Sequence, residues 1–323
     1  MRDAAAAWLL LMNTIVMHGA VPRCDGAQHQ ATAGAVHYAS PQGSSHATGT
    51  LDDPLDTIAA CVARLRAPGD QCRLRGGTYR EPTVAVRGAR GSPEAPVVIA
   101  AAEGEDVLID GTVELPRNDT WTPVPGREID GARLWETNVP AATVGGGVTQ
   151  LWLDGEMLTP ARWPNALWSE MQSFGMRAPF NWSNWARFNS SVAWSPSNYT
   201  PGVPLRLVDA GGPTGLGSSG ISARGAVFIG NIAHDDTFVG TVTSHVAGSD
   251  EFMVLIEPSV QHMGNTKQGN SLYFFEGPSS LLDQAGEWSY SQAEQKLRVR
   301  TPDGTSPAQH RMTYKAQTYA MNI

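Results

Sequence analysis

Residues 36–81 read VHYASPQGSSHATGTLDDPLDTIAACVARLRAPGDQCRLRGGTYRE, and this stretch decides the predicted fold. Its first residues, VHYAS, alternate in polarity as a β-strand does. After a loop rich in Gly, Ser and Pro, apolar residues recur at helical spacing over residues 55–65, with Asp56 as the expected N-cap. Pro68 and Gly69 end that helix. The stretch therefore predicts a strand, an amphipathic helix and then further strands.

Short β-runs follow this helix, with Gly-containing turns between them and no intervening helix. They read CRLRG, TVAVRG, PVVIAAA and DVLIDG. Separate hairpins would give this pattern, and so would the faces of a parallel β-helix whose coils stack on one another. Because a stack of coils has an open apolar end, the preceding helix is a natural cap. The pattern predicts an all-β protein, and in the β-helix arrangement the cap and first coils would lie in residues 35–111.

Residues 112–323 are expected to hold an inserted antiparallel β-rich region and a continuation of the β-helix. The run VTQLWLDGEMLTPARWPN at residues 148–165 has an Asp154-Gly155 turn between alternating segments, which is typical of a hairpin. The Gly/Ser-rich residues 211–225 are predicted to form a flexible loop. Strand character returns after them, in AVFIGNIAHDDTFVGTVTSHV and EFMVLIE.

The N-terminus has the pattern of a secretory signal peptide. Arg2 precedes an apolar run at residues 4–17, which is too short to span a bilayer comfortably. Small residues favour cleavage near Gly26, so residues 1–26 are predicted to be the signal. A buried N-terminal helix is the alternative. No later run is apolar enough to cross a membrane, and we expect a secreted, extracellular protein.

The chain has three cysteines, and in an oxidising compartment an odd number leaves one thiol without a disulfide partner. If Cys24 leaves with the signal, Cys61 and Cys72 remain as a pair. A bridge across so short a loop would stabilise the fold by roughly 2–3 kcal/mol. The alternative is two buried free thiols. Acceptor motifs for N-linked glycans also fit a secreted glycoprotein, and they lie at Asn118, Asn181, Asn189 and Asn198.

Composition limits the partners. The 323 residues are 41% hydrophobic and 17% charged, with a formal net charge of −8 and a pI near 5.5. Nucleic acids and anionic membranes both call for a basic surface, so neither is an expected partner. Neutral polysaccharides suit an acidic surface, whereas anionic ones would require a locally basic cleft. The histidines lack metal-ligand spacing, so no metal site or cofactor is predicted, although calcium bound by scattered aspartates stays open.

Four blocks of the chain resemble secreted right-handed parallel β-helix proteins of the pectate-lyase-like superfamily, which is related to polysaccharide lyases and β-helix glycosidases. The blocks are residues 36–81, PVVIAAAEGEDVLIDG at 96–111, LWLDGEMLTPARWPN at 151–165 and LYFFEGPSSLLDQAGEWSYSQAEQKLRVRTPDG at 272–304. Three positions depart from the family pattern, which usually has Asp, Pro and Asp where this chain has Ser45, Ala285 and Ser291.

The resemblance implies a right-handed parallel β-helix with an N-terminal capping helix and an inserted antiparallel β-rich region. It also implies an extracellular carbohydrate-active protein whose partner is a polysaccharide or glycan. In such proteins the catalytic carboxylates lie mainly in coils after the fourth block. We therefore expect this chain to be the N-terminal portion of a glycoside hydrolase or lyase that lacks its catalytic coils. The catalytic residues stay unidentified. A non-catalytic extracellular β-helix that binds glycans, or that serves as a structural module, is the alternative.

Arg162 and Trp163 are the candidate substrate-binding residues, because Arg pairs with carboxylates and Trp stacks on sugar rings. The alternative is an Arg that anchors a turn against a packed Trp. Glu287 has the spacing of a structural turn. Asp235 and Asp236 form an acidic pair beside His234, which we interpret as an ordinary turn. A group of tryptophans could form a platform for a sugar ring: Trp182, Trp185 and Trp194.

Overall fold

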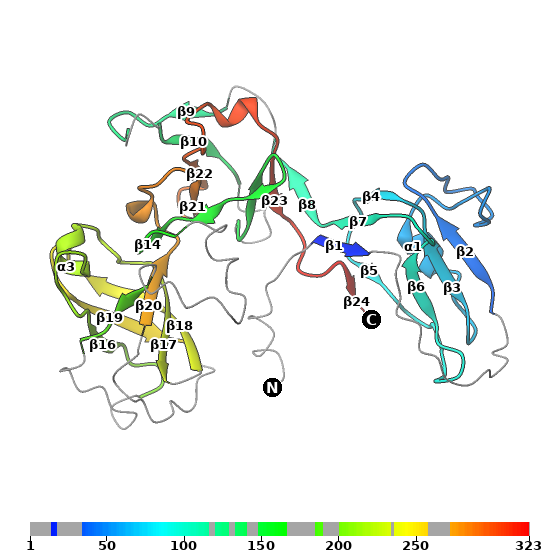
Figure 1. Cartoon of the computed structure of the whole chain (residues 1–323), viewed down its shortest axis with the longest axis horizontal. Helices are drawn as coiled ribbons and strands as arrows, with labels where there is room; N and C mark the ends of the chain where they lie inside the picture. The colour runs from blue at the N-terminus through cyan, green and yellow to red at the C-terminus, as the bar shows by residue number, and fades with distance from the viewer. Residues whose placement is uncertain are drawn as a thin grey trace. The chain divides into compact units, whose positions relative to one another are not determined.

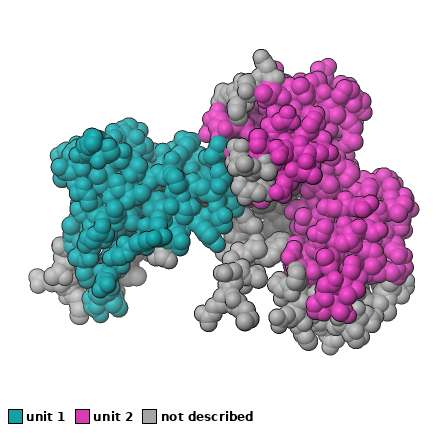
Figure 2. All heavy atoms as spheres, turned by 180° about the vertical axis from the view of Figure 1, so that it is seen from behind, with its two compact units in different colours: residues 1–113, 315–323 teal, residues 114–314 magenta. Residues whose placement is uncertain are grey.

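In the part of the chain that the structure describes, the regular secondary structure is nearly all β-strand with few helices, which confirms the all-β prediction (Figure 1). The computed structural model describes residues 14–17, 34–115, 120–128, 133–140, 148–166, 185–189, 200–233, 236–257 and 272–322. The chain forms two compact units, coloured separately in Figure 2: residues 1–113 with 315–323 (unit 1), and residues 114–314 (unit 2). Within the described residues, no helix is long and apolar enough to cross a membrane.

Unit 1 contains several parallel strand pairs. β3 pairs in parallel with β2 and with β6, β4 pairs in parallel with β7, and β5 pairs in parallel with β24, whereas β1 runs antiparallel to β7. The elements are β1 (Thr14–Met17), β2 (Val36–Ala39), α1 (Ile58–Val62), β3 (Gln71–Leu74), β4 (Gly77–Tyr79), β5 (Val84–Ala85), β6 (Val98–Ala101), β7 (Val107–Asp110) and β24 (Met321–Asn322).

The parallel strands stack in register, so that like positions lie above one another. Ala39, Leu74 and Ala101 form one such row, and all three are buried. Their inward side chains join the apolar side of α1 in one core. Successive residues of a strand point to opposite faces of the sheet, so the side chains next to these buried positions lie on the outer face.

Helix α1 is shorter than the pattern predicted, and its cap differs. Thr57, not Asp56, is the N-cap, and its side chain accepts a hydrogen bond from the Ala60 amide. The next two amides, which have no partner within the helix, donate to the Glu81 carboxylate: Ile58 at 2.6 Å and Ala59 at 3.0 Å. A carboxylate at this end also suits the helix dipole. A residue 23 positions away thus sets where the helix begins.

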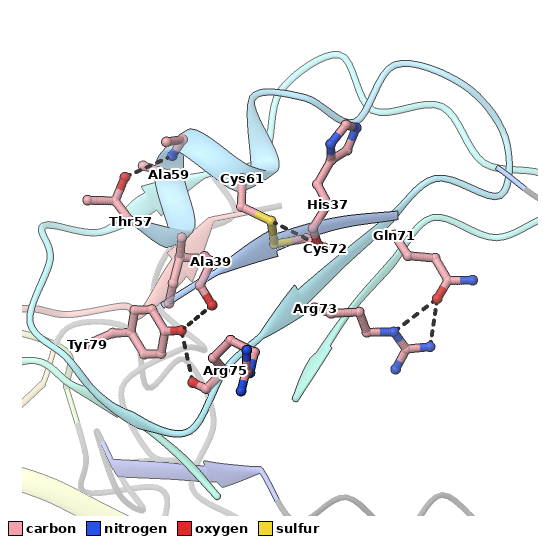
Figure 3. The surroundings of a disulfide bond; sticks show 12 residues. His37, Ala39, Thr57, Ala59, Cys61, Gln71, Cys72, Arg73, Arg75 and Tyr79 are labelled. Atoms are coloured by element: carbon pink, nitrogen blue, oxygen red, sulfur yellow. Dashed lines mark hydrogen bonds between the residues drawn. A yellow bond between two sulfur atoms is a disulfide. The ribbon is translucent and has the colours of Figure 1, made fainter. Parts of the chain in front are cut away.

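The disulfide prediction is confirmed, since Cys61 of α1 and Cys72 of β3 are bonded with their Cα atoms 5.8 Å apart (Figure 3). Below it, the Tyr79 hydroxyl donates to the carbonyls of Ala39 and Arg75, at 2.8 and 2.9 Å. These contacts explain part of the RGGTYRE sequence: the tyrosine joins successive strands, and the glutamate caps α1.

The sheets of unit 2 are mainly antiparallel. Its largest sheet has the order β14-β20-β17-β18-β19-β16, with β15 also pairing with β20. The strands in and leading into this unit are β8 (Thr112–Glu114), β9 (Thr122–Pro123), β10 (Trp135–Asn138), β11 (Leu151–Leu153), β12 (Glu156–Met157), β13 (Thr159–Pro160), β14 (Arg162–Trp163), β15 (Ala186–Arg187), β16 (Leu205–Val208), β17 (Val227–Ala233), β18 (Asp236–His245), β19 (Glu251–Ile256), β20 (Leu272–Glu276), β21 (Glu287–Ser291), β22 (Lys296–Val299) and β23 (Met312–Lys315).

The predicted hairpin at Asp154-Gly155 is confirmed between β11 and β12. Both residues have positive φ, 52° and 93°, which is the backbone that a tight two-residue hairpin turn requires. The loop predicted at residues 211–225 instead contains a short helix, α3 (Leu216–Ser219). Two carboxylates hold its first turn, because Asp209 accepts from the Leu216 amide and Asp250 from the Gly217 amide. Short 3-10 turns also occur, η3 (Ser279–Leu281) and η4 (Pro307–Gln309).

Candidate functional site

Arg162 and Trp163, the predicted substrate contacts, form the short edge strand β14 and are both buried, at 2% and 8% exposure. Trp163 faces the aromatic core, with its ring 6.0 Å from that of Phe275. Arg162 lies on the other face of the strand, where its guanidinium carbon is 4.0 Å from the centre of the Phe274 ring. Its Nε also donates to the Pro164 carbonyl at 3.0 Å. This packing favours the alternative in which Arg162 anchors a turn.

Glu287 lies at the start of β21 and is completely buried. Its carboxyl oxygens accept hydrogen bonds, all of 3.2 Å, from the backbone amides of Arg162, Asp283 and Gln284. Asn165 donates to Asp283 at 2.9 Å beside it. The ARWPN and GEW segments, more than 100 residues apart in sequence, are therefore one polar cluster, which we call the Glu287 cluster.

Burial dominates the electrostatics of this cluster. Desolvation raises the pKa of Glu287 to about 8, and the amide hydrogen bonds oppose it only in part. Burial also raises the pKa of Glu276, whose backbone is paired with Arg162 across the strands, and the charge of Arg162 opposes that rise. A carboxyl that stays protonated near neutral pH can act as a general acid. Glu287 is enclosed, however, so its observed contacts hold the ends of β14 and β21 together.

Glu287 should make the stability of unit 2 fall as pH rises. The folded state retains this proton up to a pKa of about 8, whereas the unfolded chain releases it near the ordinary value of 4.5. Between those values the folded state binds more protons, so the free energy of unfolding decreases with pH. We expect Glu287→Gln to remove the part of this slope that Glu287 contributes, while Glu276 retains its own part, and to exceed the native protein in stability above pH 8, on the order of a few kcal/mol.

Urea unfolding at pH values of about 5, 7 and 9 would measure this difference. Glu257→Gln is the matched control, because Glu257 is exposed and its side chain makes no hydrogen bond or ion pair within the described structure. Equal pH slopes for the native protein and Glu287→Gln would show that Glu287 is ionised in the folded state throughout this range.

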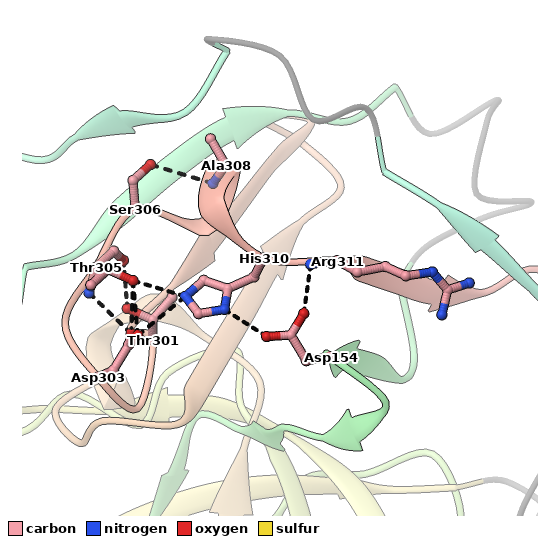
Figure 4. A network of polar contacts seen from close by, with 8 residues as sticks. All are labelled: Asp154, Thr301, Asp303, Thr305, Ser306, Ala308, His310 and Arg311. Carbon is pink, nitrogen blue, oxygen red and sulfur yellow. Dashed lines mark hydrogen bonds and ion pairs between the residues drawn. The ribbon is translucent and has the colours of Figure 1, made fainter.

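A second polar network in unit 2 centres on His310 and joins the β11–β12 turn to the loop after β22 (Figure 4). His310 Nδ1 lies 2.7 Å from Asp154 Oδ2, and His310 Nε2 lies 2.8 Å from the Thr305 hydroxyl. Asp154 also accepts from the Arg311 amide at 2.7 Å, and Asp303 accepts from the Thr305 hydroxyl at 3.0 Å. Because each polar atom of the ring has a partner, the network fixes the loop against the hairpin.

Several other sequence-predicted sites fall outside the described residues: Asn118, Asn181, Asn198, Trp182, Trp194, His234 and Asp235. Trp185 packs its ring 5.0 Å from Phe274, edge to face. Asn189 is half-buried, and its backbone amide donates to the Val208 carbonyl at 2.9 Å. Asp236 begins β18. Among the residues that the structure describes, no group of three or more His, Cys, Asp or Glu side chains is arranged to hold a metal ion.

Comparison with known proteins relates the chain to carbohydrate-active enzymes by partial matches. No protein-family model matches it. The pectate lyase PEL9 of Emericella nidulans is 48% identical over 80 residues, which cover 24% of this chain and 19% of that protein. A solved structure described as a glycoside hydrolase aligns with a TM-score of 0.56 at 20% identity, over 89% of this chain and 47% of that one. The chain thus shares a fold with about half of that structure and spans less than a fifth of the pectate lyase.

A structure of XylC in complex with xylose aligns with a TM-score of 0.41 and 15% identity, over 88% of this chain and 32% of that one.

Proposed function

We propose that this chain is an extracellular, carbohydrate-active β-helix protein that takes part in cleaving a polysaccharide. The observation that carries the proposal is the 48% identity to a pectate lyase over 80 residues. The fold shared with a glycoside hydrolase structure is compatible with it. The proposed partner is a polysaccharide or glycan, and the proposed location follows from the signal-like residues 1–26 and from the disulfide.

The parallel pairings of unit 1 support the β-helix part of this proposal. A β-helix has three sheets, and each coil of the chain would add one strand to each of them. The strands of one sheet would stack without a change of register. The groups β2-β3-β6, β4-β7 and β5-β24 have this arrangement. Helix α1 covers the same core and would serve as its cap.

A non-catalytic role in glycan binding is a second candidate, favoured by the burial of Glu287, Arg162 and Trp163. Buried side chains of this kind could stabilise a glycan-binding unit without taking part in catalysis. The acceptor motifs at Asn118, Asn181, Asn189 and Asn198 remain proposed glycosylation sites in either case.

The purified secreted protein should deplete from solution when mixed with at least one insoluble plant, algal or bacterial polysaccharide. Release of new reducing ends would identify a hydrolase, and reducing ends with the ultraviolet absorbance of an unsaturated uronate would identify a lyase. Depletion without any product would favour the binding role. A folded protein that neither depletes nor releases product across the panel would refute the proposed function.

A further inference from the structure

The His310 network of unit 2 joins a hydroxyl, an imidazole and a carboxylate through two short contacts. Thr305 supplies the hydroxyl, 2.8 Å from His310 Nε2, and Asp154 supplies the carboxylate, 2.7 Å from His310 Nδ1. Figure 4 shows the imidazole ring between these two partners. Both distances lie within the range of about 2.6–3.2 Å that a nucleophile, its base and the group that orients the base require. The order of the groups is that of a hydrolytic triad.

The contact with Asp154 selects the tautomer of His310 that a base requires. An ionised carboxylate can only accept hydrogen bonds, so we assign the ring proton to Nδ1. Nε2 then presents its lone pair to the Thr305 hydroxyl. Asp154 is itself held in place, because its other oxygen accepts from the Arg311 amide at 2.7 Å. The imidazole is therefore oriented before any substrate arrives.

A second carboxylate suits the charge that would develop on the ring. Asp303 accepts from the Thr305 hydroxyl at 3.0 Å, and its Oδ2 lies 3.4 Å from His310 Nε2. The hydroxyl has one proton, which it can donate either to Asp303 or to Nε2. When Nε2 takes this proton, the ring becomes an imidazolium with a carboxylate beside each nitrogen. Opposite charges at these distances stabilise that state.

The hydroxyl and the backbone next to it are accessible to a small molecule. Thr305 and Ser306 are both partly exposed, and the side chains of Asp154 and Asp303 are 52% and 50% exposed. The Ser306 amide donates no hydrogen bond within the described part of the chain. The amide that follows a nucleophile is a common donor to the oxyanion of acyl transfer.

We propose that Thr305, His310 and Asp154 form a hydrolytic site for small carboxylic esters, an activity separate from the proposed polysaccharide role. Thr305 Oγ attacks the ester carbonyl carbon while its proton passes to His310 Nε2, and Asp154 positions the ring. The bond from that carbon to the alcohol oxygen then breaks, and the alcohol leaves with the proton from Nε2. Water attacks the acyl-threonine and gives one proton to Nε2, the carboxylic acid leaves, and Thr305 Oγ regains its proton. One ester and one water thus give one acid and one alcohol.

Hydrolysis of 4-nitrophenyl acetate by the purified chain tests this site. Thr305→Val keeps the shape of the side chain without its hydroxyl, and we expect the rate to fall at least about 100-fold, as it should in His310→Gln. Thr305→Ser should retain the activity. Asp154→Asn should lower kcat by about 100-fold at an unchanged KM, and Asp154→Glu should restore part of the loss. His46→Gln is the matched control, because His46 is an exposed histidine elsewhere in the chain.

Mass spectrometry of the native protein, quenched in acid during turnover, should find an acetyl group on the peptide that contains Thr305. Absence of this acetyl group would overturn the site, and that result requires no variant to fold. A native rate no higher than that of free imidazole at the same concentration would also overturn it, as would a folded Thr305→Val protein with native activity. An equal loss in His46→Gln would assign the activity to surface imidazoles. An unchanged thermal melt would establish that each variant is folded.

Discussion

Asp70→Ala is expected to lower the free energy of unfolding of unit 1 by about 3 kcal/mol, because it leaves three backbone amides without their acceptor. Asp70 is 4% exposed, and Oδ1 accepts from Ala35 at 2.9 Å. Oδ2 accepts from Arg66 and from Ala67, both at 2.8 Å. Asp70, just before β3, thus links two other segments through one carboxylate: the residues that follow α1 and the residue that precedes β2.

The same hydrogen bonds give this effect a defined pH dependence. The amides of Ala67 and Arg66 hold the pKa of Asp70 below its ordinary value. A carboxyl with a lowered pKa stabilises the fold above the pKa of the unfolded chain, and this stabilisation is lost as pH falls through the lower, folded-state value. The native protein and Asp70→Ala should therefore differ most near neutral pH and converge in acid.

Hydrogen exchange of peptides from residues 34–113 would report the stability of this unit separately from unit 2. Asp52→Ala is the control, since Asp52 is exposed and forms no hydrogen bond or ion pair within the described structure. Asp70→Asn keeps one acceptor oxygen and should fall between the two. If Asp70→Ala exchanged no faster than Asp52→Ala, the three amides would not depend on Asp70.

Loss of the Cys61–Cys72 disulfide should cost unit 1 roughly 2–3 kcal/mol, chiefly by freeing the unfolded chain. The bond closes a sequence separation of 11 residues and fixes α1 to β3. Both cysteines are fully buried, so replacing them jointly by alanine also leaves a small cavity. The double variant should unfold at lower denaturant concentration than the oxidised native protein.

Reduction provides the matched control for this prediction. A reducing agent should move the unfolding midpoint of the native protein toward that of the double variant, and it should leave the double variant unaffected. Mass spectrometry of the purified, non-reduced protein should recover a peptide with Cys61 linked to Cys72. Free thiols at both positions would contradict the structure.

Local patterns in the sequence predicted the features that depend on near neighbours. The strand at β2 and the Asp154-Gly155 hairpin each follow from a few adjacent residues. The helix, by contrast, ends at Val62, well before the predicted end at Pro68-Gly69. Pairing of the cysteines followed from their number and from the expected loss of Cys24.

The contacts that organise the polar groups could not be predicted, because they join residues far apart in the chain. Glu81 caps a helix 23 residues before it, and Asp154 meets His310 across 156 residues. Glu287 has the spacing of a turn, but it proved to be a buried strand residue that receives the Arg162 amide from 125 residues away. No propensity or spacing rule specifies such partners, since they follow from how the strands stack and pair.

Equilibrium binding of the folded, disulfide-intact protein to defined oligosaccharides tests most directly the proposal that this chain binds a polysaccharide. Isothermal titration with neutral and acidic oligosaccharides should give saturable binding for at least one of them. The absence of binding to every saccharide, by a protein that unfolds cooperatively and retains the Cys61–Cys72 bond, would contradict the account.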